Sequence, residues 1–256
     1  MHNHLSLIVG GSSGMGLAIA RSLVNEGDDV LILAHDQKKL DAAAAELNGI
    51  RDGSAETISA DLYETDSVAG VVKKIDGESR HIAKLVNAAG VFAPKPFLEN
   101  TVADYDKYHD LNRATFLITQ AAARNMVQHK GGSILNIGSM WARQAIKATP
   151  SAAYSMAKAG IHSMTQHLAM ELGEYNIRVN AISPAVVVTP IYGAFIDADK
   201  IEDTLTDAFD AFHPVGRVGR PEDVAHHAVL LLSDKAGWTT GAIHDVDGGV
   251  MAGRNQ

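Results

Sequence analysis

Short apolar runs alternate with helix-periodic segments along almost the whole chain, and this alternation limits the possible fold more than any other feature. The runs that predict strands cover residues 5–9, 30–34, 56–60, 82–86, 132–137, 178–182 and 242–246. Helical spacing predicts helices over residues 17–24, 37–47, 66–75, 103–129, 152–175 and 222–232. Strands joined by crossover helices run parallel and are covered on both faces. The sequence therefore predicts an α/β fold, a doubly wound (Rossmann-type) sheet of about seven parallel strands, in one domain over residues 1–256.

Glycine-rich and polar segments follow the predicted strands at residues 10–16, 87–90, 139 and 184–189. Ligands of such sheets bind at the carboxyl ends of the strands, so we expect these segments to form one site. Gly10, Gly14 and Gly16 stand between the first strand and the first helix, where bare backbone can approach a pyrophosphate. A tight turn also needs glycine, so this motif by itself leaves a purely structural role open.

Tyr154 and Lys158 are four residues apart on a predicted helix, which places the phenol and the ammonium on one face. A nearby cation in a dry pocket would lower the tyrosine pKa by ~2 to 3 units and make it a usable base. Such a pair also occurs by chance on solvated helices. Ser139 at a strand end and Asn112 on the preceding long helix favour a site instead.

The segments Gly10 to Gly16 and Asn87-Ala88-Ala89-Gly90 resemble the nucleotide turn and the Asn-Asn-Ala-Gly segment of the short-chain dehydrogenase/reductase family. The likeness spans nearly the whole chain, and its departures here are Val9 for Thr and Ala88 for the second Asn. The resemblance implies an NAD(P)-dependent oxidoreductase that interconverts a secondary alcohol and a ketone or aldehyde by hydride transfer.

The four residues Asn112, Ser139, Tyr154 and Lys158 match the family's catalytic residues one by one. By this resemblance Tyr154 is the general acid in reduction and the general base in oxidation, and Ser139 donates a hydrogen bond to the substrate oxygen. Lys158 would lower the Tyr154 pKa and bind the nicotinamide ribose. Asn112 would hold a water that links Lys158 to solvent.

The resemblance also implies the cofactor contacts. Asp61, beside Leu62, matches the family's acidic contact to adenine, although it could equally cap a helix. Residues 184–189 resemble a Pro-Gly segment with Ala185 in place of Gly, and form either a nicotinamide clasp or an ordinary strand exit. The expected cofactor-binding residues are Gly10, Ser12, Ser13, Gly14, Met15, Gly16, His35, Asp61, Leu62, Asn87, Ala88, Ala89, Gly90, Tyr154, Lys158, Pro184, Val187 and Thr189.

The end of the second strand decides between NAD and NADP. An acid there accepts both ribose hydroxyls, whereas a cation pairs with a 2′-phosphate. By family register these positions are Ala34 and His35, while Asp36 could still reach the ribose if the strand ends early. The missing acid and the partial cation of His35 favour NADP, with NAD left open.

The substrate side lies in the loop after Ser139 and in a segment at about 189–213 that resembles the family's variable lid. Trp141, Tyr192 and Phe195 would supply apolar walls. Arg143 could bind a carboxylate or phosphate, or lie at the surface. Six carboxylates in the lid favour a neutral or partly apolar substrate unless Arg143 points inward. The expected substrate contacts are Ser139, Trp141, Arg143, Tyr154 and Tyr192.

Composition excludes several classes of partner. A net charge of -8 and the lack of a Lys/Arg cluster argue against nucleic acid. The sequence shows no signal segment and no membrane-spanning stretch, so we expect a cytoplasmic protein without a membrane partner. It has no cysteine, and its 12 histidines lack metal-ligand spacing, so no metal is expected and the histidines are interpreted as solvated. The family likeness implies a homo-oligomer, a tetramer, acting on a small molecule.

Two other functions are compatible with parts of the sequence. A serine hydrolase would use Ser139 as a nucleophile, but the surrounding residues lack the G-x-S-x-G elbow. A non-catalytic, nucleotide-sensing relative of the same fold remains as the alternative, and the four intact residues Asn112, Ser139, Tyr154 and Lys158 speak against it.

Overall fold

The computed structural model describes residues 4–253 and is built on one parallel sheet of seven strands in the order β3-β2-β1-β4-β5-β6-β7. The strands are β1 (His4–Val9), β2 (Asp29–Ala34), β3 (Ala55–Ser59), β4 (His81–Asn87), β5 (Gly132–Ile137), β6 (Ile177–Pro184) and β7 (Ile243–Val246). The first three strands follow one another from β1 to the edge strand β3. The chain then crosses back to the other side of β1, where β4 begins the second half of the sheet. The predicted doubly wound sheet is confirmed, and the switch point lies between β1 and β4.

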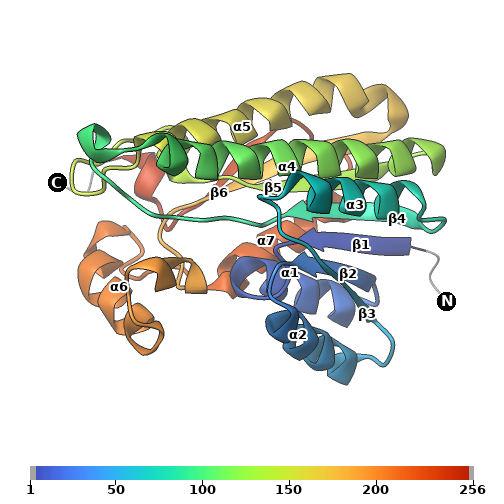
Figure 1. The fold of residues 1–256 in the computed structure, drawn as a ribbon, viewed down its shortest axis with the longest axis horizontal. Helices are drawn as coiled ribbons and strands as arrows, with labels where there is room; N and C mark the ends of the chain where they lie inside the picture. Colours follow the sequence, from blue (N-terminus) through green and yellow to red (C-terminus); the bar gives the residue numbers. More distant parts are fainter. Residues whose placement is uncertain (1–3, 254–256) are drawn as a thin grey trace.

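Helices cover both faces of the sheet (Figure 1). One face carries α1 (Gly14–Asn25), α2 (Gln37–Ile50) and α7 (Pro221–Leu232), and the other carries α3 (Thr65–Asp76), α4 (Val102–Gln128) and α5 (Ala152–Leu172). The helix predicted over residues 152–175 ends as an α-helix at Leu172 and closes with a 3-10 turn, Gly173–Tyr175.

Side-chain alternation in the central strand shows why both faces need helices. Leu5, Leu7 and Val9 pack into the core on the side of α3, α4 and α5, whereas Ile8 packs into the core on the opposite side. Successive strand residues point to opposite faces, so an uninterrupted apolar run is stable only between two helix layers.

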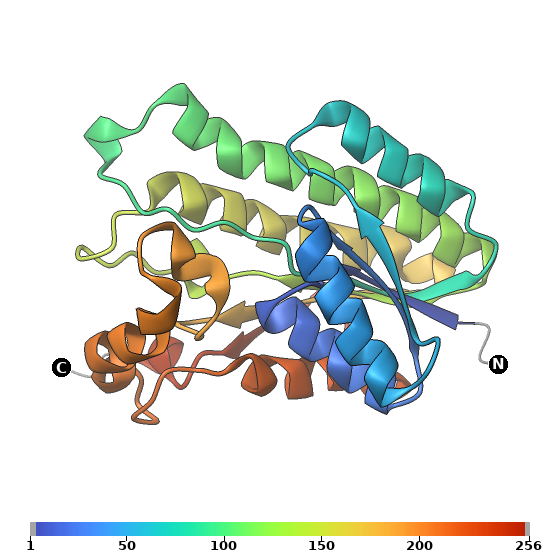
Figure 2. The same ribbon diagram turned by 60° about the horizontal axis from the view of Figure 1, so that its bottom comes forward.

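The segment after β6 forms a group of short helices beside the carboxyl edge of the sheet. It contains α6 (Ile201–Phe209), flanked by the 3-10 turns Pro190–Ala194, Ala198–Lys200 and Asp210–Phe212. Figure 2 shows these elements together at the end of the molecule away from the N-terminus. The sequence periodicity does not predict α6. No helix within residues 4–253 is long and apolar enough to cross a membrane.

Candidate active site

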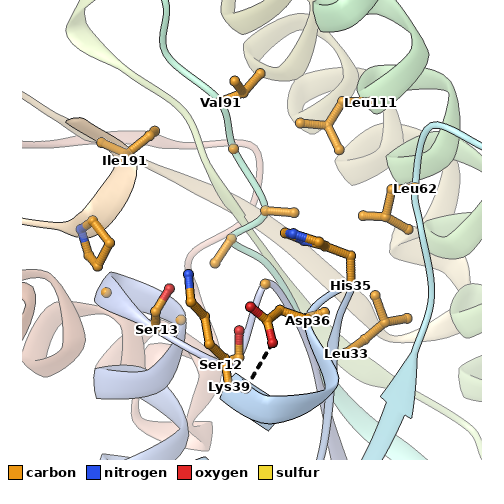
Figure 3. Close-up of a pocket in the computed structure, with 18 of the residues that line it drawn as sticks. Ser12, Ser13, Leu33, His35, Asp36, Lys39, Leu62, Val91, Leu111 and Ile191 are labelled. Carbon is orange, nitrogen blue, oxygen red and sulfur yellow. Dashed lines mark hydrogen bonds between the residues drawn. The ribbon is translucent and has the colours of Figure 1, made fainter. Parts of the chain in front are cut away.

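A groove of about 410 Å³ crosses the carboxyl edge of the sheet above β1, β2 and β4 (Figure 3). Its lining comes from the glycine turn, the ends of β2, β3 and β4, and the start of the segment after β6. Thirteen of the expected cofactor residues line it: Gly10, Ser12, Ser13, Gly14, Met15, Gly16, His35, Asp61, Leu62, Ala88, Ala89, Gly90 and Thr189. The fold therefore brings together segments that lie up to 179 residues apart, from Gly10 to Thr189.

The glycine turn is shaped by close backbone packing. Gly10 has a φ of 83°, and a Cβ on it would lie 2.5 Å from the backbone nitrogen of Ala89. A Cβ on Gly16 would lie 2.2 Å from the Gly10 carbonyl oxygen. Both positions exclude any side chain, so the structural role of the glycines is real and is compatible with a role in binding.

The first turn of α1 fits a pyrophosphate. Ser13 is the N-cap residue, yet its side chain makes no capping hydrogen bond, and the turn holds no acidic residue. The free backbone N–H groups and the positive end of the helix dipole therefore remain available in the groove to an anion.

Titratable side chains line the other end of the groove, and only some of them were expected from the sequence to bind the cofactor. His35 and Asp36 line it, and Lys39 on the first turn of α2 does so as well. Figure 3 shows the Lys39 amine pointing into the groove beside Ser12 and Ser13. The Asp36 carboxylate accepts a hydrogen bond from the Lys39 backbone N–H at 3.1 Å and so caps α2. Sequence reasoning missed Lys39 because it considered only the strand end, although one helical turn returns residue 39 to the same edge.

Asp61 lies in the groove and does not cap a helix. Its carboxylate accepts a hydrogen bond from the Tyr63 backbone N–H at 2.9 Å, while α3 begins later, with Glu64 as its N-cap. The helix-cap interpretation was therefore wrong. Further groove residues that were not expected include Tyr63, Val91, Lys107, Leu111 and Ile191.

Beyond the groove, a cavity of about 40 Å³ contains the hydroxyl-bearing side chains Ser139 and Tyr154. It is also lined by Trp141 and Tyr192, which sequence analysis expected, and by Phe92, which it missed. Pro184, Val187 and Thr189 line the same cavity. Ser139 follows β5 and Tyr154 lies in the first turn of α5, so the sheet edge and one helix set their separation.

Lys158 and Asn112 lie on the other side of Tyr154. The Lys158 ammonium donates a hydrogen bond to the Ile137 carbonyl at 2.7 Å and stands 5.8 Å from the centre of the Tyr154 ring. Asn112 donates to the Ala157 carbonyl at 2.8 Å. These side chains and Tyr154 line a third cavity of about 20 Å³.

Burial sets the protonation of this pair. Burial raises the pKa of Tyr154 to about 12, and a hydrogen bond with Ser139 opposes that rise only in part. Burial lowers the pKa of Lys158 to about 8. The expectation that Lys158 lowers the Tyr154 pKa is therefore not met by the chain alone, because the cost of burying a phenolate exceeds any benefit from the neighbouring amine.

Asn87 connects the elements that carry the site. Its amide nitrogen donates to Thr119 at 2.9 Å and to Asn136 at 2.8 Å, which ties β4 to α4 and β5. Asn87 lines the 20 Å³ cavity rather than the groove, and its buried Oδ1 has no hydrogen-bond partner among residues 4–253. The structure thus places this expected cofactor residue behind the groove.

Arg143 does not line any of these three cavities. Its guanidinium pairs with the carboxylate of Asp245 on β7. The interpretation of Arg143 as an anion-binding residue is therefore wrong in this structure, and the alternative of a surface side chain, 39% exposed, holds.

The interpretation of the histidines as solvated is wrong in two cases. His162 on α5 and His213 after α6 are both buried. Burial lowers the pKa of His162 to about 4, which leaves it neutral. No group of three or more potential metal ligands occurs among the described residues.

The comparisons with known proteins agree with this geometry. The family model described as enoyl-(acyl carrier protein) reductase matches residues 9–251. The chain is 33% identical over 251 residues to 3alpha-hydroxysteroid dehydrogenase of Mediterraneibacter gnavus, covering 97% of each chain. It is 33% identical over 246 residues to D-threitol dehydrogenase of Mycolicibacterium smegmatis, covering 96% of this chain and 92% of the relative.

Solved structures give the same result. A short chain dehydrogenase/reductase family protein, 34% identical, superposes with a TM-score of 0.84 over 97% of each chain. L-sorbose reductase from Gluconobacter frateurii, solved in complex with NADPH and L-sorbose, is 26% identical and superposes with a TM-score of 0.88 over 97% of each chain.

The groove lies at the switch point of the sheet and shares Met15, Thr189 and Ile191 with the cavity lined by Ser139 and Tyr154. Together with the comparisons, this arrangement defines the class, an NAD(P)-dependent oxidoreductase acting on CH–OH groups. Within that class, the chain belongs to the short-chain dehydrogenase/reductase family. It interconverts an alcohol and a carbonyl with NAD(P), and the alternative of a non-catalytic relative finds no support in these comparisons.

Proposed function

We propose that Ser139, Tyr154, Lys158 and Asn112 carry out the reaction of this oxidoreductase. The observation that carries the proposal is that Tyr154 lies between two cavities, one shared with Ser139 and the other with Lys158 and Asn112. NAD(P), when bound, supplies or accepts the hydride at this end of the groove. The chain's own residues orient the substrate oxygen and move its proton.

Tyr154 is the proton donor in reduction and the acceptor in oxidation. Because burial holds the phenol protonated, the side chain as it stands is set to protonate a carbonyl oxygen. Ser139 donates a second hydrogen bond to that oxygen and fixes it near Tyr154. The Lys158 ammonium, 5.8 Å from the Tyr154 ring centre, stabilises the phenolate that remains after proton transfer.

Asn112 holds a water that returns the proton from solvent. The 20 Å³ cavity between Asn112 and Lys158 has room for one water molecule. A water there would also satisfy the buried Oδ1 of Asn87. The proton path supported by these contacts runs from Tyr154 past Lys158 to this cavity.

The cofactor preferred by the groove is NADP. No acidic residue stands at position 34 or 35. The groove offers to a 2′-phosphate His35 and the ammonium of Lys39, for which no ion pair is found within residues 4–253. Asp36 opposes this preference, but its carboxylate is engaged at the N-terminus of α2. The cofactor contacts proposed are the residues expected from sequence other than Asn87, which lines the 20 Å³ cavity instead, with Lys39 added.

Two properties of the whole chain belong to the same proposal. The segment 189–213 acts as the substrate lid, supported by its position beside the cavity at Ile191 and Tyr192. The protein forms a homotetramer in the cytoplasm, in which α4 and α5 pair between subunits. Phe116 on α4 and Met156 on α5, each more than half exposed, support that pairing.

The decisive experiment compares the wild type with Tyr154→Phe. NADPH binding, followed by fluorescence, is expected to stay within about 2-fold, while ketone reduction falls by about 10³-fold or more because the proton donor is lost. Ser139→Ala should lower the rate by about 10²-fold. Substantial turnover in Tyr154→Phe would overturn the assignment. Light scattering on the same samples tests the tetramer.

A further inference from the structure

The cavity that contains Ser139 and Tyr154 has a lining that limits which substrates can bind. Its other lining residues are Met15, Phe92, Gly138, Trp141, Pro184, Ala185, Val187, Thr189, Ile191 and Tyr192. None of these described residues carries a charge. The only polar side-chain groups in the lining beside the reacting pair are hydroxyls and the Trp141 ring nitrogen.

Aromatic rings surround the catalytic phenol. Phe92 packs edge-on against the Tyr154 ring at 4.9 Å between ring centres, and against Tyr192 at 6.0 Å. Phe195 extends this cluster, 6.1 Å from Phe92 and 6.0 Å from Tyr192, and is 51% exposed. A ring or alkyl group placed next to the reacting carbon would bury its apolar area against these side chains.

No cation among the described residues lines this cavity. Arg143 pairs with Asp245, and Lys158 donates to the Ile137 carbonyl behind Tyr154. A carboxylate or phosphate entering the cavity would lose its hydration with no cation among the lining residues to pair with it. Such burial is costly, so the cavity discriminates against anions.

The lid strengthens that discrimination. It carries six carboxylates, Asp197, Asp199, Glu202, Asp203, Asp207 and Asp210, against the single cation Lys200. Lys200 pairs with Asp197, and Glu202 pairs with Arg220 outside the segment. The lid segment therefore carries a net negative charge, which disfavours an anionic substrate beside it.

From these observations we infer that the substrate is an uncharged ketone or secondary alcohol with an apolar, ring-bearing substituent, and that carboxylate- and phosphate-bearing substrates are rejected. The inference rests on the proposed function of Ser139 and Tyr154 and adds the substrate class. Phe92 is then a specificity-determining residue.

A matched pair of ketones tests the charge directly. Methyl 4-oxocyclohexanecarboxylate and 4-oxocyclohexanecarboxylate differ mainly in the negative charge. With NADPH, kcat/KM for the ester is expected to exceed that for the acid by about 100-fold, and Arg143→Gln should leave this ratio unchanged. Equal values, or a preference for the acid that Arg143→Gln abolishes, would overturn the inference while leaving the oxidoreductase assignment intact.

Binding gives a second readout that does not depend on turnover. Of the two tryptophans, Trp141 lines the cavity and Trp238 is fully exposed, so Trp238→Phe leaves Trp141 as the reporter. Its fluorescence in the presence of NADP⁺ should respond to the ester at concentrations about 100-fold lower than to the acid. Failure to bind NADP⁺ at all would instead contradict the proposed function, which keeps the two failures distinguishable.

The aromatic wall has its own test. Phe92→Ala is expected to lower kcat/KM for cyclohexanone about 10-fold more than for acetone, because acetone has no ring to bury. Phe97→Ala is the matched control, since Phe97 is 75% exposed and lines none of these cavities. An equal loss for both ketones in Phe92→Ala would show that Phe92 only supports Tyr154, and would remove the aromatic wall from the inference.

Discussion

The two halves of the site are built by different means. The groove half offers backbone groups and side chains at the solvent boundary, such as His35 and Lys39, to the proposed cofactor. The reaction half consists of buried side chains, and burial moves the pKa of Tyr154 up to about 12 and that of Lys158 down to about 8. A motif therefore predicts which residues the fold brings to both halves, but it does not predict their charge state where water is excluded.

The largest expected effect on stability concerns a glycine of the reaction half. A Cβ on Gly138 would lie 2.1 Å from Nε2 of the buried His162, so Gly138→Ala should destabilise the fold by about 3 kcal/mol in urea unfolding. In the groove, a Cβ on Gly90 would meet only the Ile191 Cδ1 atom at 3.5 Å. Gly90→Ala should therefore cost less than about 1 kcal/mol.

The double variant Gly138→Ala/His162→Ala checks the cause of that loss. Removing the imidazole should recover part of the stability, measured as a coupling energy of about 1 kcal/mol or more. Additive losses would mean that the contact with His162 is not responsible.

The second prediction concerns Lys158 and pH. Because its folded pKa is about 8 and the unfolded value is about 10.4, the unfolded chain binds more protons between these values. Stability from this group therefore rises with pH, by about 2 kcal/mol between about pH 7.5 and 9.5. Urea unfolding of Lys158→Met should show a gain smaller by that amount. The same pH dependence in wild type and variant would contradict burial as the source of the shift.

The third prediction concerns Lys39 in the groove. Lys39→Ala should raise the Kd for NADPH about 10-fold and leave the Kd for NADH unchanged, because only NADPH carries the 2′-phosphate. Lys38→Ala is the matched control, since Lys38 is exposed on the same helix but does not line the groove. Equal effects of the two substitutions on both cofactors would refute a specific contact.

The smallest expected effect comes from Asp36. Asn is also a good N-cap, so Asp36→Asn should keep α2 intact while removing a negative charge beside the proposed phosphate position. The affinity for NADPH is expected to rise about 3-fold, measured by fluorescence titration. A weaker affinity for NADPH with unchanged stability would show that the carboxylate contributes to binding.

The sequence by itself determined the alternation of strands and helices and the positions of the glycine turn, Ser139, Tyr154 and Lys158. These follow from periodicity and spacing, which depend on neighbours along the chain. Helical periodicity also predicts the position of Lys39, because the first turn of α2 places residue 39 at the same edge of the sheet as the end of β2.

Only the tertiary structure decided the engagement of Arg143 with Asp245, the place of Phe92 against Tyr154, and the burial of His162. Each depends on residues that lie far apart in the chain, such as Arg143 and Asp245 with a separation of 102 positions, and that meet only when the sheet is assembled. Burial then follows from the packing of whole layers, and with it the charge states of Tyr154 and Lys158. The sequence pattern alone does not predict how far a side chain is buried from water, and therefore does not predict the pKa of that side chain.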